Sequence, residues 1–295
     1  MNKAQDSSYI KQIMKPSFRF LLALLFFQGA LSAFSDSPVI DDVGLKARFQ
    51  KGLEGLVEGK DTPSLEELNK QLSRKQTKAP FLAKKSGKFP SHELYDRCRS
   101  SVLMIGRIYK CDKCTRWHVG SASAFAISSD GIIATNYHVI EEKDGAALGA
   151  MDLSGKTYAV TEVLAASKAD DVAILRLKDA ELKPLPLARQ PAPVGTSISV
   201  ISHPDGRYFT MTKGDVSRYY LFRNEEKSSA HRMAITADYA KGSSGGPVLN
   251  GRGEVVGMVS STNSIYYSKV KGQNQNLQMV IKSCIPVAAI NKLLN

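Results

Sequence analysis

From about residue 94 onward, the chain consists of short apolar or alternating runs separated by turn signals, and this pattern restricts the fold more than any other feature. Examples are SVLMIGRIY, GIIATNYHVI, DVAILRL and EVVGMVS. Residues 128–131 (SSDG) and 250–253 (NGRG) are typical of hairpin turns. Many short strands at this spacing, with no helical segment between them, predict an antiparallel barrel or sandwich.

A proline-rich segment divides these strands into two groups. Residues 182–195 (LKPLPLARQPAPVG) carry four prolines and therefore cannot form a central strand. We predict an all-β fold of two antiparallel β-barrels joined by this segment, with barrel one at about 93–182 and barrel two at about 195–283. The sequence IPVAAINKLL predicts a terminal helix over residues 285–294.

The first residues have the pattern of a secretory signal peptide. Four basic residues precede an apolar run over residues 20–34, and small residues follow it. The run is shorter than the roughly 20 residues that span a bilayer comfortably. We predict a signal peptide over residues 1–33 and an exported protein, periplasmic or secreted. Membrane contact is expected only if this segment is retained.

Residues 34–92 differ in sequence pattern from the strands that follow, and we interpret them as an N-terminal extension, a linker or a pro-segment. The sequence TPSLEELNKQL predicts a short helix with Thr62 as N-cap and Pro63 at its first position. A basic stretch follows over residues 74–88. We interpret the net charge of +12 as a feature that favours solubility and that reflects the basic linker. We expect no nucleic-acid partner, because zinc-finger spacing and an aromatic-studded RNA-binding pattern are both missing from the sequence.

Four cysteines leave several alternatives open. They are Cys98, Cys111, Cys114 and Cys284. In an exported chain an even count suggests disulfides, and three pairings are possible. Cys111 and Cys114 form a C-x-x-C unit with His118 four residues further on. We favour a local bridge that closes a hairpin end, with His118 on the strand. We expect no metal site, because a zinc site would need four ligands and the sequence has no second clustered pair.

The glycine-rich stretch KGSSGGP at residues 241–247 is a candidate for holding a nucleophile. A phosphate loop would read G-x-x-x-x-G-K-[ST] before a helix, which this stretch does not. It does match G-x-S-x-G, the nucleophile elbow of α/β-hydrolases, in which the histidine follows the serine. All five histidines precede Ser244, which excludes an active enzyme of that fold. They are His92, His118, His138, His203 and His231.

The order histidine, aspartate, serine remains, which is the order of chymotrypsin-type enzymes. IIATNYHVI places His138 at the exit of an apolar strand, and ADDVAILRL places an acid at the entry of another. Ser244 lies in the tight turn before a third strand. Each residue therefore lies at a strand end, where loops present catalytic groups from a rigid scaffold.

These three segments resemble those of the trypsin-like serine peptidases, especially the bacterial HtrA/Deg-type branch. That branch has T-N-x-H-V, D-[VIL]-A-[VIL]-L and G-[NDS]-S-G-G segments, and all three occur here in order over residues 95–295. The resemblance implies two antiparallel barrels with the site between them, protein or peptide substrates and no cofactor. Because 51 residues follow Ser244, enough to complete barrel two and one helix, we expect no PDZ-mediated assembly.

The resemblance also implies a role for each residue. Ser244 is the expected nucleophile and His138 the base that takes its proton. Asp171 is expected to orient the imidazole, because the acid of the family directly precedes the apolar-Ala pair; Asp170 is the rival acid. The backbone N–H groups of Gly242 and Ser244 are expected to form the oxyanion hole. The predicted function is a serine endopeptidase acting through an acyl-enzyme intermediate.

The sequence indicates the substrate preference less clearly than it indicates the catalytic residues. In trypsin-like enzymes the residue six before the serine lies at the floor of the specificity pocket. Here that residue is Asp238, which would favour a Lys or Arg side chain. A register shift of one would place Ala237 or Tyr239 there instead. The alternative functions are a catalytically inactive binding protein on the same fold, or a metal or redox protein that uses the Cys111–Cys114 unit.

Overall fold

The computed structural model describes residues 39–60, 62–80, 82, 87–142, 144–223 and 229–294. The signal peptide predicted for residues 1–33 lies outside the described residues. Within the described ranges, no helix is both long enough and apolar enough to cross a bilayer.

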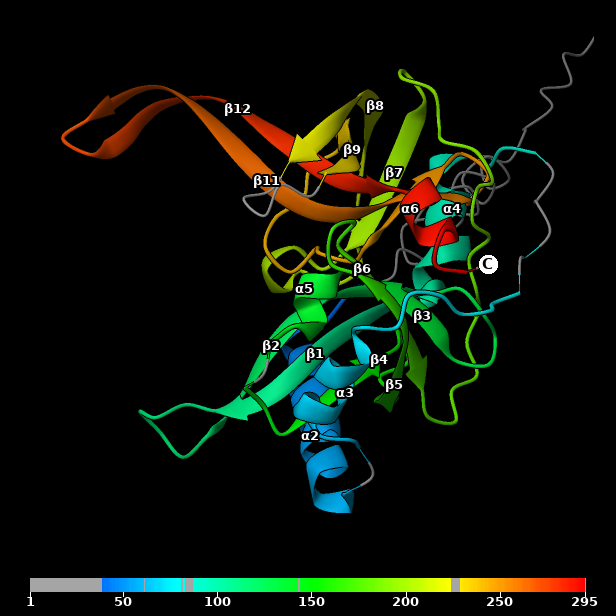
Figure 1. Cartoon of the computed structure of the whole chain (residues 1–295), viewed down its shortest axis with the longest axis vertical. Helices are drawn as coiled ribbons and strands as arrows, with labels where there is room; N and C mark the ends of the chain where they lie inside the picture. The colour runs from blue at the N-terminus through cyan, green and yellow to red at the C-terminus, as the bar shows by residue number, and fades with distance from the viewer. Residues whose placement is uncertain are drawn as a thin grey trace, which may run out of the picture. The chain divides into compact units, whose positions relative to one another are not determined.

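The strands form two closed antiparallel barrels of six strands each, which confirms the predicted fold class (Figure 1). Barrel one consists of β1 (Val102–Lys110), β2 (Trp117–Ala126), β3 (Ile132–Thr135), β4 (Ala147–Met151), β5 (Thr157–Ser167) and β6 (Val172–Leu177). Barrel two consists of β7 (Ser197–Ser202), β8 (Thr210–Arg223), β9 (Ser229–Ile235), β10 (Pro247–Asn250), β11 (Val255–Val270) and β12 (Gln273–Pro286). Short 3-10 turns occur at η1 (Arg99–Ser101) and η2 (Pro204–Gly206).

The two barrels follow the same plan. The strand order is β1-β2-β3-β6-β5-β4 in barrel one, and the corresponding order in barrel two is β7-β8-β9-β12-β11-β10. In each barrel the third strand therefore pairs with the sixth, which brings distant loops to the same barrel end. Figure 1 shows that the β1–β2 hairpin and the β11–β12 hairpin each project well beyond their barrels.

The turns and the linker between barrels follow the sequence-based prediction. The predicted turn residues 128–131 connect β2 to β3, and residues 250–253 connect β10 to β11. The proline-rich segment contains no strand and makes one isolated bridge, from Leu187 to Val255. This arrangement is expected because each proline lacks the N–H donor that a sheet ladder needs.

Two helices of the N-terminal extension pack on barrel one. These are α2 (Asp42–Gly59) and α3 (Leu65–Gln71). Leu65, Leu68 and Leu72 belong to the buried core of barrel one. These leucines are therefore part of the barrel's hydrophobic core, and their burial stabilises the fold.

The details of this extension differ from the prediction in two ways. Helix α3 is capped by Ser64, not Thr62, because Ser64 and Glu67 form a reciprocal capping box. Helix α2 was not predicted. Its three buried residues, Leu45, Phe49 and Leu53, recur every four positions. The glycines of this helix lower the helix propensity of the segment, so burial against the barrel decides its structure.

Two further helices flank the barrels. Helix α4 (Ser91–Cys98) immediately precedes barrel one. Helix α6 (Val287–Asn291) is shorter than the predicted helix over residues 285–294. The reason is that Ile285 and Pro286 remain paired in the sheet, opposite Met258 and Gly257 of β11. The helix can begin only after this pairing ends.

Candidate active site

Sheet topology brings His138 and Asp171 together. Strands β3 and β6 are antiparallel neighbours, and Thr135 at the end of β3 pairs with Ala173 at the start of β6. The chain that leaves β3 forms the short helix α5 (Tyr137–Ile140), which carries His138. Asp171 directly precedes β6, so both side chains lie at the same end of barrel one.

The imidazole of His138 and the carboxylate of Asp171 form a close pair. The Nδ1 atom of His138 lies 3.0 Å from Oδ1 and 3.1 Å from Oδ2 of Asp171. The backbone N–H of His138 also donates to Oδ1 at 3.2 Å. Because Nδ1 faces a carboxylate, it carries the proton and leaves Nε2 as the proton acceptor. Asn136 donates to the backbone carbonyl of Asp171 at 3.0 Å and holds the turn in place.

Asp170, the rival acid, has different partners. Its Oδ2 atom accepts a hydrogen bond from Ser167 Oγ at 3.0 Å and lies 3.9 Å from Lys292 Nζ. The carboxylate that contacts His138 is therefore that of Asp171.

The serine turn is held between the two barrels. Ser123 of β2 donates its backbone N–H to the carbonyl of Ser244 at 2.8 Å and its hydroxyl to the carbonyl of Gly242 at 2.9 Å. On the other side, Gly245 N–H donates to the carbonyl of Val259 in β11 at 3.0 Å. Gly245 has φ +86°, and a Cβ there would collide with the carbonyl of Ser123. Glycine is required at this position both for the backbone conformation and for space.

Ser260 connects the serine turn to the His138–Asp171 pair. Its hydroxyl donates to Asp171 Oδ2 at 2.7 Å, and its backbone carbonyl accepts a hydrogen bond from Ser244 Oγ at 3.1 Å. A hydroxyl has one proton, so in this conformation Ser244 does not also donate to His138. The structure thus pairs the predicted base with the predicted acid, and it links Ser244 to Asp171 through Ser260, with the hydroxyl proton of Ser244 directed to the Ser260 carbonyl.

The backbone N–H groups of Gly242 and Ser244 have no acceptor among the described residues. Gly242 has φ +92°, and a Cβ there would lie 2.5 Å from the carbonyl of His203. A side chain at this position has no room. Both donors are therefore available to a ligand.

His203 lies close to this turn, in a buried environment, at the end of β7. Its Nδ1 atom accepts a hydrogen bond from the backbone N–H of Phe209 at 3.0 Å. Burial lowers the pKa of His203 to about 4. The side chain is therefore neutral, and its position is structural.

The pKa of His138 lies above its ordinary value of about 6.5. Burial by itself lowers this pKa, but the hydrogen bond and charge of Asp171 outweigh it, and Glu141 and Glu142 add to the effect. The side chain of His138 remains 48% exposed. The neutral imidazole, the form that accepts a proton, thus predominates only at a pH above this raised value.

A cleft of about 630 Å³ opens beside His138 and Asp171. Residues from both barrels line it, including Lys168, Tyr220, Phe222 and Arg232. The guanidinium of Arg232 lies over the ring of Phe222 at 5.1 Å and donates to the carbonyl of Ala169 at 3.2 Å. The cleft is large enough for an extended peptide segment.

The residues predicted for the specificity pocket lie next to the serine turn in sequence but have other partners. The side chain of Asp238 is 86% exposed, and its carboxylate lies 3.2 Å from Lys282 Nζ. Tyr239 is buried, and its hydroxyl lies 2.8 Å from each of the carbonyls of Ser261 and Ser283. Asp238 is not among the residues that line the cleft beside His138.

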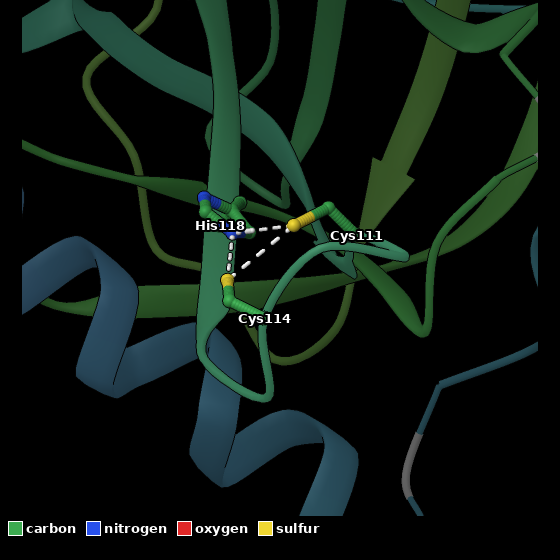
Figure 2. Close-up of side chains that lie close together, drawn as sticks. All are labelled: Cys111, Cys114 and His118. Carbon is green, nitrogen blue, oxygen red and sulfur yellow. Dashed lines mark hydrogen bonds between the residues drawn. The ribbon is translucent and has the colours of Figure 1, made fainter.

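No disulfide joins any of the four cysteines, so the structure does not contain the predicted bridges. Cys98 and Cys284 are buried in different surroundings, and burial raises the pKa of the Cys284 thiol to about 12. Cys111 and Cys114 lie at the tip of the β1–β2 hairpin with their sulfurs 3.3 Å apart, well beyond the roughly 2.05 Å of a disulfide bond. His118 lies with them (Figure 2). Hydrogen bonds to His118 and Cys111 lower the pKa of the Cys114 thiol to about 6.

Sequence reasoning missed two residues that organise the site, Ser260 and Ser123. Ser260 follows the apolar run of residues 255–259, and Ser123 interrupts the apolar half of β2. A polar residue within an otherwise buried strand is the signal that could have identified them. Their partners, however, are distant in sequence and become apparent only when both barrels are assembled.

Comparison with known proteins agrees with this geometry. The family model described as "Trypsin-like peptidase domain" matches residues 122–258. This region includes His138, Asp171 and Ser244.

Several curated proteins match about half of the chain. "Serine protease Rv3671c" of Mycobacterium tuberculosis is 30% identical over 143 residues, which cover 46% of this chain and 35% of that protein. "Probable periplasmic serine endoprotease DegP-like" of Hahella chejuensis is 32% identical over 155 residues, covering 52% and 31%. "Anti-sigma-I factor RsgI9" of Acetivibrio thermocellus is 31% identical over 144 residues, covering 48% and 19%. The chain thus spans well under half the length of these relatives.

Among solved structures, the active form of the Rv3671c protease of M. tuberculosis superimposes with a TM-score of 0.54. The alignment covers 74% of this chain and 90% of that structure at 21% identity. At this identity the similarity supports the fold.

The raised pKa of His138 predicts a titration that NMR can follow. We expect the imidazole of His138 to titrate with a midpoint above 6.5. Glu141→Gln should lower that midpoint by about a few tenths of a pH unit, because removing a nearby negative charge destabilises the imidazolium. Glu66→Gln, on the exposed face of α3, is the matched control and should leave it unchanged. A midpoint at or below 6.5, or equal shifts in both variants, would contradict the assignment.

Proposed function

We propose that this chain, which carries a domain of the trypsin-like peptidase family, is a serine endopeptidase that cleaves protein or peptide substrates with Ser244, His138 and Asp171. The observation that carries the proposal is the hydrogen-bonded pair of His138 and Asp171, joined through Ser260 to the turn that holds Ser244. A histidine or a glycine-rich turn with a purely structural role would not require this arrangement, in which both barrels contribute residues to one site.

In the proposed reaction, the Oγ of Ser244 attacks the carbonyl carbon of the scissile peptide bond while its proton moves to Nε2 of His138. The imidazolium then gives that proton to the leaving amine as the C–N bond breaks. Water hydrolyses the resulting acyl-enzyme by the same route and restores the hydroxyl of Ser244. Asp171 remains ionised throughout and stabilises the imidazolium.

The free N–H groups of Gly242 and Ser244 suit the negative charge that develops on the carbonyl oxygen. Each donor of this kind is worth roughly 10²–10³ in rate. The positive φ of Gly242 and the bond from Ser123 to its carbonyl support this role, because together they fix the orientation of the turn.

The proposal includes one rearrangement. The hydroxyl of Ser244 turns from the carbonyl of Ser260 to Nε2 of His138 when a substrate is bound. Such hydrogen bonds are often long or misdirected before the substrate arrives and tighten in the complex. We propose that a rotation of the Ser244 side chain makes this change, at a cost that is small compared with the barrier of the reaction.

We also propose that the protein acts after export from the cytoplasm. The support comes from the signal-peptide pattern of residues 1–33 and from relatives that are named as periplasmic serine endoproteases. Catalysis by the proposed triad requires no cofactor.

The proposed activity predicts covalent labelling by a fluorophosphonate, which reacts with activated serines. We expect the wild-type chain to be labelled at Ser244, and the Ser244→Ala variant to be unlabelled and to lose on the order of 10⁴-fold or more in peptide hydrolysis. Ser243→Ala, one residue earlier in the same turn, controls for general damage to the turn. An absence of labelling in folded wild type, or labelling that survives Ser244→Ala, would contradict the proposal and favour a non-catalytic binding role.

For substrate choice, we infer a preference for small or aliphatic side chains at the cleaved position. Lys282 already pairs with Asp238, so this carboxylate is not free to recruit a basic side chain. Tyr239 is buried, and its hydroxyl lies 2.8 Å from the carbonyls of Ser261 in β11 and Ser283 in β12. The sequence-based expectation of a Lys or Arg preference at Asp238 is the alternative to this inference.

Peptides that differ only in Val or Arg at the cleaved position test this inference. We expect kcat/KM to be at least about 10-fold higher with Val, a typical discrimination by an apolar pocket. Asp238→Asn should change neither value by more than about 2-fold, whereas Lys282→Ala should raise turnover of the Arg peptide by freeing the carboxylate. Preferential cleavage after Arg that is lost in Asp238→Asn would restore the original expectation.

A further inference from the structure

The tip of the β1–β2 hairpin contains a feature that peptide hydrolysis does not use. Strands β1 and β2 pair continuously to the tip, where Tyr109 pairs with His118 and Lys110 with Trp117. The intervening residues 111–116 form the turn at the tip. They carry the side chains of Cys111 and Cys114 toward the ring of His118, as Figure 2 shows.

Three donor atoms converge at this tip. The sulfur atoms of Cys111 and Cys114 are 3.3 Å apart, and they lie 3.2 Å and 3.0 Å from Nε2 of His118. In tetrahedral zinc sites, with Zn–S distances of about 2.3 Å and Zn–N distances of about 2.0 Å, such donors lie about 3.5–3.8 Å apart. Spreading the triangle by about 0.3–0.5 Å would match one face of that tetrahedron. This cluster is the only group of three or more such ligands among the described residues.

The donor set selects the type of ion. Thiolate and imidazole ligands suit Zn²⁺ and disfavour Ca²⁺ and Mg²⁺, which prefer oxygen ligands. Two thiolates also neutralise the charge of a divalent ion. Neutrality matters here, because Lys110, Lys113 and Arg116 are neighbours of the cysteines in the sequence and their charges would oppose a net positive site.

The hairpin tip lacks other means of support. None of residues 111–116 is buried, so no hydrophobic core fixes their conformation. The visible packing is local: the ring of Tyr109 lies 5.6 Å from that of His118, and Lys110 Nζ lies 4.7 Å from the ring of Trp117. In small segments that cannot build a core, a bound metal commonly supplies the missing stabilisation.

We propose that Cys111, Cys114 and His118 form a zinc-binding site that holds the tip of the β1–β2 hairpin. The three residues occupy one face of a tetrahedron, and the fourth position faces solvent and takes a water molecule. The site is structural for the hairpin and independent of peptide hydrolysis, since its residues belong to neither the serine turn nor the His138–Asp171 pair. The C-x-x-C unit is thus a pair of metal ligands, not the disulfide that the sequence suggested.

Zinc binding to the purified full-length chain, reduced before dialysis against Zn²⁺, tests the proposal. Mass spectrometry of the metal content should find one zinc per chain. The separate variants Cys111→Ser, Cys114→Ser and His118→Gln should each lower zinc affinity on the order of 100-fold or more in competition with a chromophoric chelator. The matched controls Cys98→Ala and His92→Gln should retain wild-type affinity within about 2-fold.

Two further measurements separate loss of the site from loss of the fold. Circular dichroism should show unchanged barrels in all variants, and Cys114→His, which replaces one ligand by another, should recover much of the binding lost in Cys114→Ser. Cobalt bound in place of zinc should show the thiolate charge-transfer absorption in the wild type and in the two controls, and the absorption should be lost or much weaker in the three ligand variants. Reduced wild type that binds no zinc, or binding that persists in the three ligand variants, would overturn the proposal, as would binding of Cu⁺ but not Zn²⁺.

Discussion

The site depends on one hydrogen-bonded junction, in which Ser260 of barrel two donates its hydroxyl to Asp171 of barrel one at 2.7 Å. The same carboxylate is hydrogen-bonded to Nδ1 of His138, and the backbone carbonyl of Ser260 accepts a hydrogen bond from the hydroxyl of Ser244. The three residues of the proposed triad are thereby positioned by two barrels with separate cores. Charge-assisted hydrogen bonds of this kind are stronger than neutral ones, so they define the geometry as well as stabilise it.

A second set of contacts fixes the serine turn in the same frame. Ser123 reaches from β2 to the carbonyls of both Gly242 and Ser244, and Gly245 pairs with β11. Neither barrel alone would determine the conformation of this turn. The N-terminal helices contribute indirectly, because Leu65, Leu68 and Leu72 complete the core of the barrel that carries His138, Asp171 and Ser123.

Much of this arrangement was predictable from the sequence, and the exceptions have physical reasons. The alternating runs predicted two barrels, and the strand-end positions of His138, Asp171 and Ser244 indicated one site. Ser260 was not predicted, because its partner Asp171 lies 89 positions away in the sequence. Helix α2 was not predicted, because burial against the barrel outweighs the low helix propensity of its glycines. The cysteines were misjudged because spacing alone does not reveal that His118, on the returning strand, faces both thiols.

The central claim is that Asp171, and not its neighbour Asp170, orients His138 for catalysis. Measuring kcat/KM for peptide hydrolysis by Asp171→Asn and Asp170→Asn tests it most directly, since the two variants make the same change at adjacent positions. We predict a loss on the order of 10⁴-fold for Asp171→Asn, because the amide no longer favours the productive tautomer of His138, and a change of no more than a few-fold for Asp170→Asn. Equal losses in the two variants, or near wild-type activity in Asp171→Asn, would contradict it.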